Sequence, residues 1–142
     1  MKKKGSIHYF TEDTTFTLKD KRKTNSWIRK TIELENKNPG DLNYIFCSDS
    51  YLLDLNIQYL NHNTLTDIIT FNSADTANEI SGDIFISIDR IKENANNIGT
   101  DFTDELHRVI IHGILHLCGY KDKSQDEKKQ MRAMEEHYLS LR

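Results

Sequence analysis

Residues 104–118 form the most restrictive segment of the sequence, because an apolar run, two histidines and a following glycine occur together there. The spacing of the aliphatic residues predicts a helix, and Gly119 favours the left-handed conformation that commonly ends one. His112 and His116 lie four residues apart, so their imidazoles share one helix face. The fold of this chain must therefore contain a largely apolar helix that carries two stacked imidazoles.

A third candidate ligand follows the glycine. We expect Gly119 to turn the chain back, so that Asp122 faces the same metal as His112 and His116. The resulting spacing, H-x-x-x-H-x-x-G-x-x-D, resembles the extended zincin arrangement, in which three protein ligands leave one position open for water. Zinc is the expected metal, with one ion per chain, although manganese, iron and nickel also accept such ligands.

Each of these residues also has a structural alternative. Histidines on an apolar helix are often hydrogen-bonded core residues, and Asp122 could be an ordinary loop carboxylate near a helix cap at Ser124. Cys118 is chemically a possible ligand, but a helical cysteine usually just packs.

The residue after the first histidine restricts the chemistry. A zincin protease uses a glutamate there as general base, whereas this chain has Gly113, so peptide hydrolysis loses its main support. A metal that lowers the pKa of its water to about 7 and polarises a phosphoryl oxygen suits phosphodiester cleavage as well as acyl hydrolysis. The sequence identifies no catalytic base. Glu105 lies on about the same helix face as His112 and either supports the ligands from behind or complements the helix dipole.

The remaining patterns predict an α+β domain over residues 1–142, with a mixed sheet of about four strands and about five helices. We expect one strand region near the start, over 7–10 and 14–18, a strand at 42–47, and a hairpin of strands 68–71 and 84–88 joined by a polar loop that includes 72–82. We expect helices at 25–36, after Ser48, at 89–97, at 104–118 and at 125–141, the first stopped by Pro39 and Gly40 and the last begun by a capping box at Ser124.

Composition narrows the partners and the location. The formal net charge is −3, so nucleic-acid binding would rest on local basic patches at 2–4, 19–23 or 128–132, each of which is also typical of a solvated face. The lysines at the start precede no sustained apolar stretch, and no run of about 18 apolar residues exists. We therefore expect a cytoplasmic protein that binds no membrane, with Cys47 and Cys118 as free thiols.

The histidine motif also carries a family resemblance. Residues 112–122, His-Gly-Ile-Leu-His-Leu-Cys-Gly-Tyr-Lys-Asp, resemble the H-G-x-L-H-L-x-G-Y-D-H motif of the YbeY family of bacterial rRNA maturation factors. The similarity extends over most of the chain from Asp41 onward, at Leu55-Asn56, Tyr59, 66–71, 82–84, Asn94-Ala95, Glu105-Leu106, Met131 and Glu135.

This resemblance implies a zincin-like fold, a single zinc ion, and a single-strand-specific endoribonuclease that matures the 3′ end of small-subunit rRNA with zinc-bound water as nucleophile. Precursor rRNA and the small ribosomal subunit are the implied partners, and no DNA is expected. RNA as substrate comes from the resemblance, because composition does not indicate it. Two other classes remain open: an RNA-binding ribosome-assembly factor whose metal only stabilises it, and a metal hydrolase of a non-RNA substrate.

The chain departs from the family pattern in two places. Asp122 replaces the usual third histidine, which preserves metal binding but adds negative charge and should make zinc a weaker Lewis acid. Leu60 stands where the family commonly has an arginine suited to gripping phosphate. His62, Arg90 and Arg108 are alternative phosphate-binding residues, although each is also typical of an ordinary surface or helix residue.

Overall fold

The structure, a computed structural model, describes residues 5–142 and contains one mixed β-sheet. Its strands are β1 (Ile7–Glu12), β2 (Asn38–Cys47), β3 (Ile68–Asn72) and β4 (Glu79–Ser87), in the order β1-β2-β4-β3. Strands β1, β2 and β4 are parallel, and β3 pairs antiparallel with β4, so the predicted hairpin is confirmed. Strand β3 therefore forms one free edge of the sheet.

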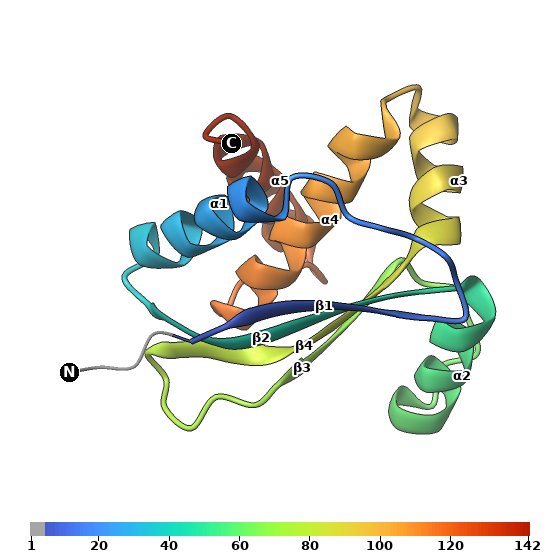
Figure 1. Ribbon diagram of the computed structural model, residues 1–142, viewed down its shortest axis with the longest axis horizontal. Helices are drawn as coiled ribbons and strands as arrows, with labels where there is room; N and C mark the ends of the chain where they lie inside the picture. Colours follow the sequence, from blue (N-terminus) through green and yellow to red (C-terminus); the bar gives the residue numbers. More distant parts are fainter. Residues whose placement is uncertain (1–4) are drawn as a thin grey trace.

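Five helices cover the sheet unequally. They are α1 (Lys21–Leu34), α2 (Asp49–Leu60), α3 (Ile88–Ile98), α4 (Phe102–Leu117) and α5 (Gln125–Leu139). Figure 1 shows α1, α4 and α5 above one face of the sheet, with α3 beside the N-terminal part of α4 and α2 against the opposite face. The predicted α+β class, with four strands and five helices, is thus confirmed.

Alternation along the strands separates two cores. On β2, Leu42, Tyr44 and Phe46 face the large core under α1, α4 and α5, whereas Cys47 joins a small core under α2. This division follows from strand geometry, because successive side chains point to opposite faces. The core under α2 is therefore much smaller than the core under α1, α4 and α5.

Helix α4 runs close against the sheet at Gly113. A Cβ atom added there would lie 3.0 Å from Cδ1 of Ile68 and 3.1 Å from Cγ2 of Ile84. Glycine therefore permits a close approach of α4 to β3 and β4, as expected where elements pack tightly. The position that carries a glutamate in a zincin protease faces the sheet here.

Several predicted boundaries were wrong. Residues 14–18 form no strand: Leu18 is buried and Phe16 packs on the core from an irregular segment. Helix α1 begins at Lys21 and ends at Leu34, before Pro39, and the chain turns through Asn36, whose φ is 60°. Pro39 lies within β2, where the register to β4 shifts between Pro39 and Leu42.

The second hairpin strand also differs from expectation. Strand β4 includes 79–82, which the polar composition had assigned to a loop, and Ile88 begins α3 after the N-cap Ser87. The predicted caps are confirmed: Ser48 Oγ accepts from the Tyr51 amide, and Ser124 forms a capping box with Glu127.

The basic patch at 2–4 lies outside the described residues. Within residues 5–142, no helix combines the length and the apolar character that crossing a membrane requires.

Candidate metal centre

The structure brings the three predicted ligands together. The Nε2 atoms of His112 and His116 lie 3.4 and 3.3 Å from Oδ2 of Asp122, and one donor atom from each residue fits within 4.8 Å of the others. The two imidazole centroids are 4.5 Å apart. Gly119, with φ 108°, makes the predicted left-handed turn that brings Asp122 back toward α4. Cys118 is not part of this cluster, and burial raises the pKa of its thiol to about 12.

Hydrogen bonds at the far side of each ring orient the histidines. Nδ1 of His116 lies 3.0 Å from the backbone oxygen of Tyr120, which can only accept, so this nitrogen must be the donor. Nδ1 of His112 lies 2.5 Å from Oε2 of Glu135. A neutral imidazole that donates from Nδ1 keeps a lone pair on Nε2, which is the atom that faces Asp122 in both residues. The donor set therefore fits a divalent metal bound by two imidazoles and one carboxylate.

A buried ion-pair network lies behind His112. Arg108 donates to both carboxylate oxygens of Glu105, at 2.9 and 2.7 Å, and to Oε1 of Glu135 at 3.1 Å. Burial opposes ionisation of Glu135, but its bonds to His112 and Arg108 prevail and lower its pKa. The hydrogen bonds of the Glu105 side chain thus go to Arg108, and Glu135 is the direct partner of His112 that sequence reasoning did not assign.

A second network fastens the loop that carries Asp122. Glu35 accepts hydrogen bonds from the hydroxyls of Tyr120, at 2.8 Å, and Tyr138. The tyrosines come from the ligand loop and from α5, whereas Glu35 follows α1. Because Tyr120 also accepts from His116, this carboxylate fixes both the loop and one imidazole.

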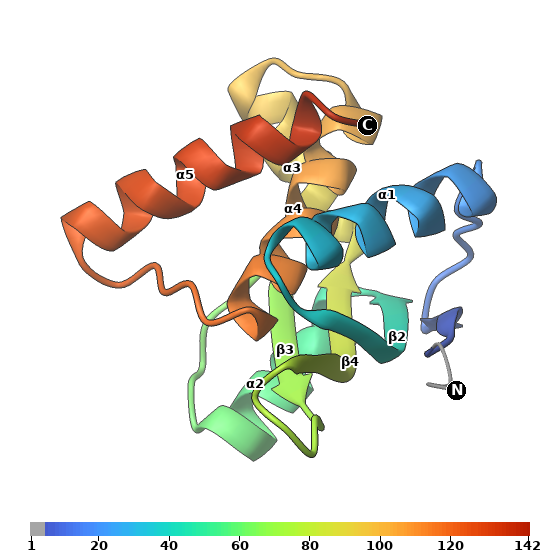
Figure 2. The ribbon, with the colours of Figure 1, turned by 90° about the vertical axis from the view of Figure 1, so that its left-hand side faces the viewer.

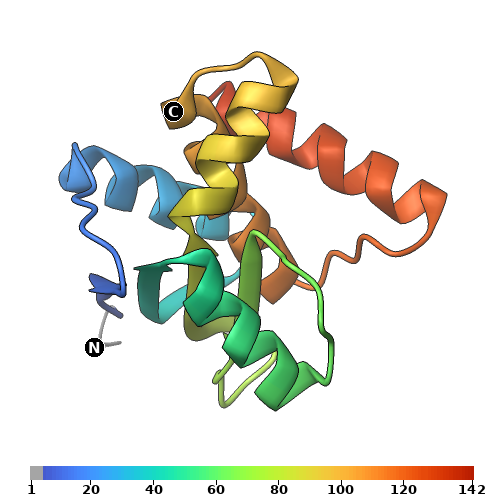
Figure 3. The same ribbon diagram turned by 90° about the vertical axis from the view of Figure 1, so that its right-hand side faces the viewer.

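The three residues open into a pocket of about 430 Å³ at the free edge of β3. Its walls come from the loop after α2, from β3, from α4 and from Asp122, and Figures 2 and 3 show the loops that follow α2 and α4 on the same side of the molecule. Asp67 lines this pocket; burial raises the pKa of its carboxyl, against the lowering effect of Arg108 and His112. The sequence placed Asp67 in the segment 66–71 that resembles the family but assigned it no role.

The alternative phosphate-binding residues lie in different places. His62 lines the pocket together with Leu60, but Arg108 is held by its two glutamates and Arg90 pairs with Asp49 at 3.0 Å. No lysine or arginine of the described chain lines this pocket.

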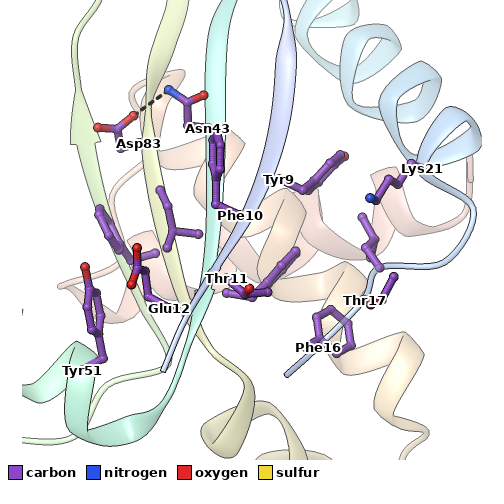
Figure 4. Close-up of a pocket in the computed structure, with 14 residues that line it drawn as sticks. Tyr9, Phe10, Thr11, Glu12, Phe16, Thr17, Lys21, Asn43, Tyr51 and Asp83 are labelled. Atoms are coloured by element: carbon purple, nitrogen blue, oxygen red, sulfur yellow. Dashed lines mark hydrogen bonds between the residues drawn. The ribbon is translucent and has the colours of Figure 1, made fainter. Parts of the chain in front are cut away.

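A larger hollow of about 760 Å³ lies elsewhere, around the edge strand β1. Figure 4 shows that it straddles this strand, with Tyr9 and Lys21 on one side and Phe10, Glu12 and Tyr51 on the other. None of the three clustered ligands lines it. The smaller pocket is therefore the better candidate for chemistry.

The fold and this cluster together define a zincin-like α+β domain with an open candidate metal centre. Comparison with known proteins specifies the family. The model of the family described as Endoribonuclease YbeY matches residues 8–141. The chain therefore belongs to the endoribonuclease YbeY family.

Individual relatives support this membership over nearly the whole chain. Endoribonuclease YbeY of Christiangramia forsetii is 49% identical over 138 residues, covering 97% of this chain and 95% of that protein. The protein of the same name from Cytophaga hutchinsonii is 49% identical over 140 residues, with coverages of 99% and 98%. The solution structure of TM1509 from Thermotoga maritima superposes with a TM-score of 0.65 at 26% identity, covering 95% of this chain and 87% of that one.

Proposed function

We propose that this chain is a zinc-dependent endoribonuclease that cuts single-stranded RNA during maturation of the small-subunit rRNA. His112, His116 and Asp122 are the proposed ligands of one zinc ion. The convergence of their donor atoms within 4.8 Å at an open pocket is the observation that carries the proposal. The relatives named endoribonuclease supply RNA as the substrate, and precursor rRNA of the small ribosomal subunit is the proposed target.

The donor set favours zinc. Two imidazole nitrogens and one carboxylate oxygen are ligands of catalytic zinc sites, and a fourth position remains for solvent or substrate. Bound there, zinc would polarise a phosphoryl oxygen and lower the pKa of a water molecule that it binds.

The chain's own residues have distinct roles in this proposal. Glu135 and the Tyr120 carbonyl hold the two imidazoles with Nε2 toward the pocket. Asp67 is the carboxylate best placed to accept a proton, because it lines the same pocket and burial raises its pKa above the usual value.

The test compares metal content and RNA cleavage in three proteins purified without a tag. The native chain should contain about one zinc per molecule and cut a single-stranded RNA, whereas Asp122→Ala should lose most of both. Asp75→Ala removes an exposed carboxylate that does not line the pocket, and it should match the native protein.

Other outcomes separate the competing classes. Stoichiometric zinc without RNA cleavage, together with RNA affinity that survives in Asp122→Ala, would favour a binding factor with a stabilising metal. The observation that favours this second class is that the described pocket lining contains no lysine or arginine. Absence of any stoichiometric metal from the native protein would contradict the hydrolase proposal.

A further inference from the structure

An exposed apolar surface borders the metal pocket. Tyr59, Leu60 and Leu65 keep 59%, 46% and 51% of their surface exposed, and the two leucines line the pocket with the candidate ligands. We call these three residues the apolar wall. Large exposed apolar groups beside a functional pocket commonly mark a binding surface.

The surroundings of the apolar wall hold it in place. The Tyr59 ring packs edge-on against Phe71, with centroids 5.8 Å apart, and Phe71 in turn contacts Phe85. Asn56 is buried and donates to the Thr64 carbonyl at 2.8 Å, which fixes the loop before Leu65. A rigid aromatic platform loses little entropy when a ligand stacks on it.

Positive charge lies on the loop that carries Asp122, which lines the pocket from a different element than the apolar wall does. Lys121 and Lys123 flank Asp122 in the loop after α4, and both are exposed. Neither lysine forms an ion pair with any residue in 5–142. We call these two residues the lysine pair. Their ammonium groups are therefore available to bind phosphate. The described residues that line the pocket include no lysine or arginine that could do so.

We infer that a single RNA strand crosses the metal pocket with its bases against the apolar wall and its phosphates toward the lysine pair. This inference rests on the proposed function and deepens it. Unpaired bases expose faces that stack on aromatic and apolar side chains, whereas the bases of a duplex are already stacked and paired. The apolar wall would thus favour unpaired bases, and the lysine pair would hold the RNA backbone beside Asp122.

The first experiment measures the affinity of the zinc-loaded protein for a fluorescent, cleavage-resistant 2′-O-methyl single-stranded RNA by anisotropy. Tyr59→Ala should weaken binding about 5-fold to 100-fold, the loss expected for one stacked base, and Tyr59→Phe should restore it. Circular dichroism and zinc content should stay native in both variants. Unchanged affinity in a folded Tyr59→Ala protein would overturn the inference and leave the apolar wall to a protein partner.

The second experiment separates the apolar wall from the lysine pair by salt dependence. Lys121→Ala and Lys123→Ala should each lower the slope of log affinity against log salt by about 0.7, the value for one single-strand phosphate. Tyr59→Ala and Leu65→Ala should lower affinity at every salt concentration without changing that slope. Lys92→Ala, which removes an exposed lysine from α3, should change neither quantity. Equal slopes in the lysine variants and the native protein would contradict the placement of the phosphates.

These measurements fail independently of the proposed function. If RNA binds with the expected pattern but native RNA is not cleaved, the proposed endoribonuclease function is wrong and the RNA-binding role of the apolar wall and the lysine pair stands. If the protein cleaves RNA but its RNA affinity does not change in Tyr59→Ala and Leu65→Ala, the enzyme proposal stands and the inferred binding surface is wrong.

Discussion

The Nδ1 atom of His112 lies 2.5 Å from Oε2 of Glu135, a nearly fully buried carboxylate on the next helix. The other oxygen of Glu135 accepts from Arg108, so the carboxylate is held from two sides. A carboxylate behind a ligating histidine fixes the ring orientation and raises the basicity of the nitrogen that binds the metal.

Glu135→Gln should therefore weaken zinc binding about 10-fold to 100-fold, because the histidine loses a charged partner. Competition with a chromophoric chelator measures the affinity directly. Glu136→Gln, on the exposed side of α5, provides a matched control and should retain native affinity. Equal zinc affinity in the two variants would show that Glu135 serves only the fold.

Asp67→Asn should reduce RNA cleavage while leaving zinc content native. The amide keeps the size of the side chain but cannot accept a proton as a carboxylate does. The expected loss is about 100-fold or more in kcat, the range of general acid–base catalysis. A native rate in the zinc-loaded variant would exclude Asp67 as the proton acceptor.

Gly113→Val should destabilise the protein by about 1 to 3 kcal/mol, because new methyl groups would press on Ile68 and Ile84. Urea denaturation measures this loss. Ala133→Val introduces the same β-branched side chain at an exposed position of α5. It should lower the free energy of unfolding by less than about 0.7 kcal/mol. Similar losses in both variants would mean that α4 can move away from the sheet.

Tyr120→Phe should lower stability at pH 8 by about 1 to 2 kcal/mol, because the Glu35 carboxylate loses a hydrogen-bond donor. Burial, together with this bond, raises the pKa of Tyr120 from 10.0 to about 12. Below pH 10 both folded and unfolded states are protonated, so the contribution is fully present. As the pH rises from 10 toward 12, the unfolded state releases its proton first and stability falls.

The difference between Tyr120→Phe and the native protein should therefore shrink between pH 8 and pH 11. Urea unfolding at both values tests this expectation. A difference that stays constant or grows with pH would contradict the assigned hydrogen bond.

Features that depend on nearby residues were predictable from the sequence. Apolar spacing gives α4, Gly119 gives its end, and Ser124 with Glu127 gives the start of α5. The clustering of Asp122 with the two histidines was predictable from the same short segment, because the turn at Gly119 brings the chain back toward α4.

Features that depend on distant residues were not predictable. Glu135 is 23 residues from His112 and Glu35 is 85 residues from Tyr120, so only the packing of α5 and α1 on α4 creates those contacts. The alternating segment 14–18 has the pattern of a strand but no strand partner, because its apolar residues pack on the core instead. The start of β4 is polar in composition and was therefore predicted to be a loop, although it pairs with β2 and β3.

All three candidate ligands come from the continuous segment 112–122, and this has a consequence for what the metal contributes to folding. Closing so short a loop costs little entropy even in a denatured chain, so the unfolded polypeptide can chelate the same ion with weaker but real affinity. Stabilisation by a ligand depends on its preference for the native state and decreases with any binding to the unfolded one. Zinc should therefore raise the melting temperature by less than its affinity for the folded protein implies, and a newly synthesised chain could capture its metal before the sheet has formed.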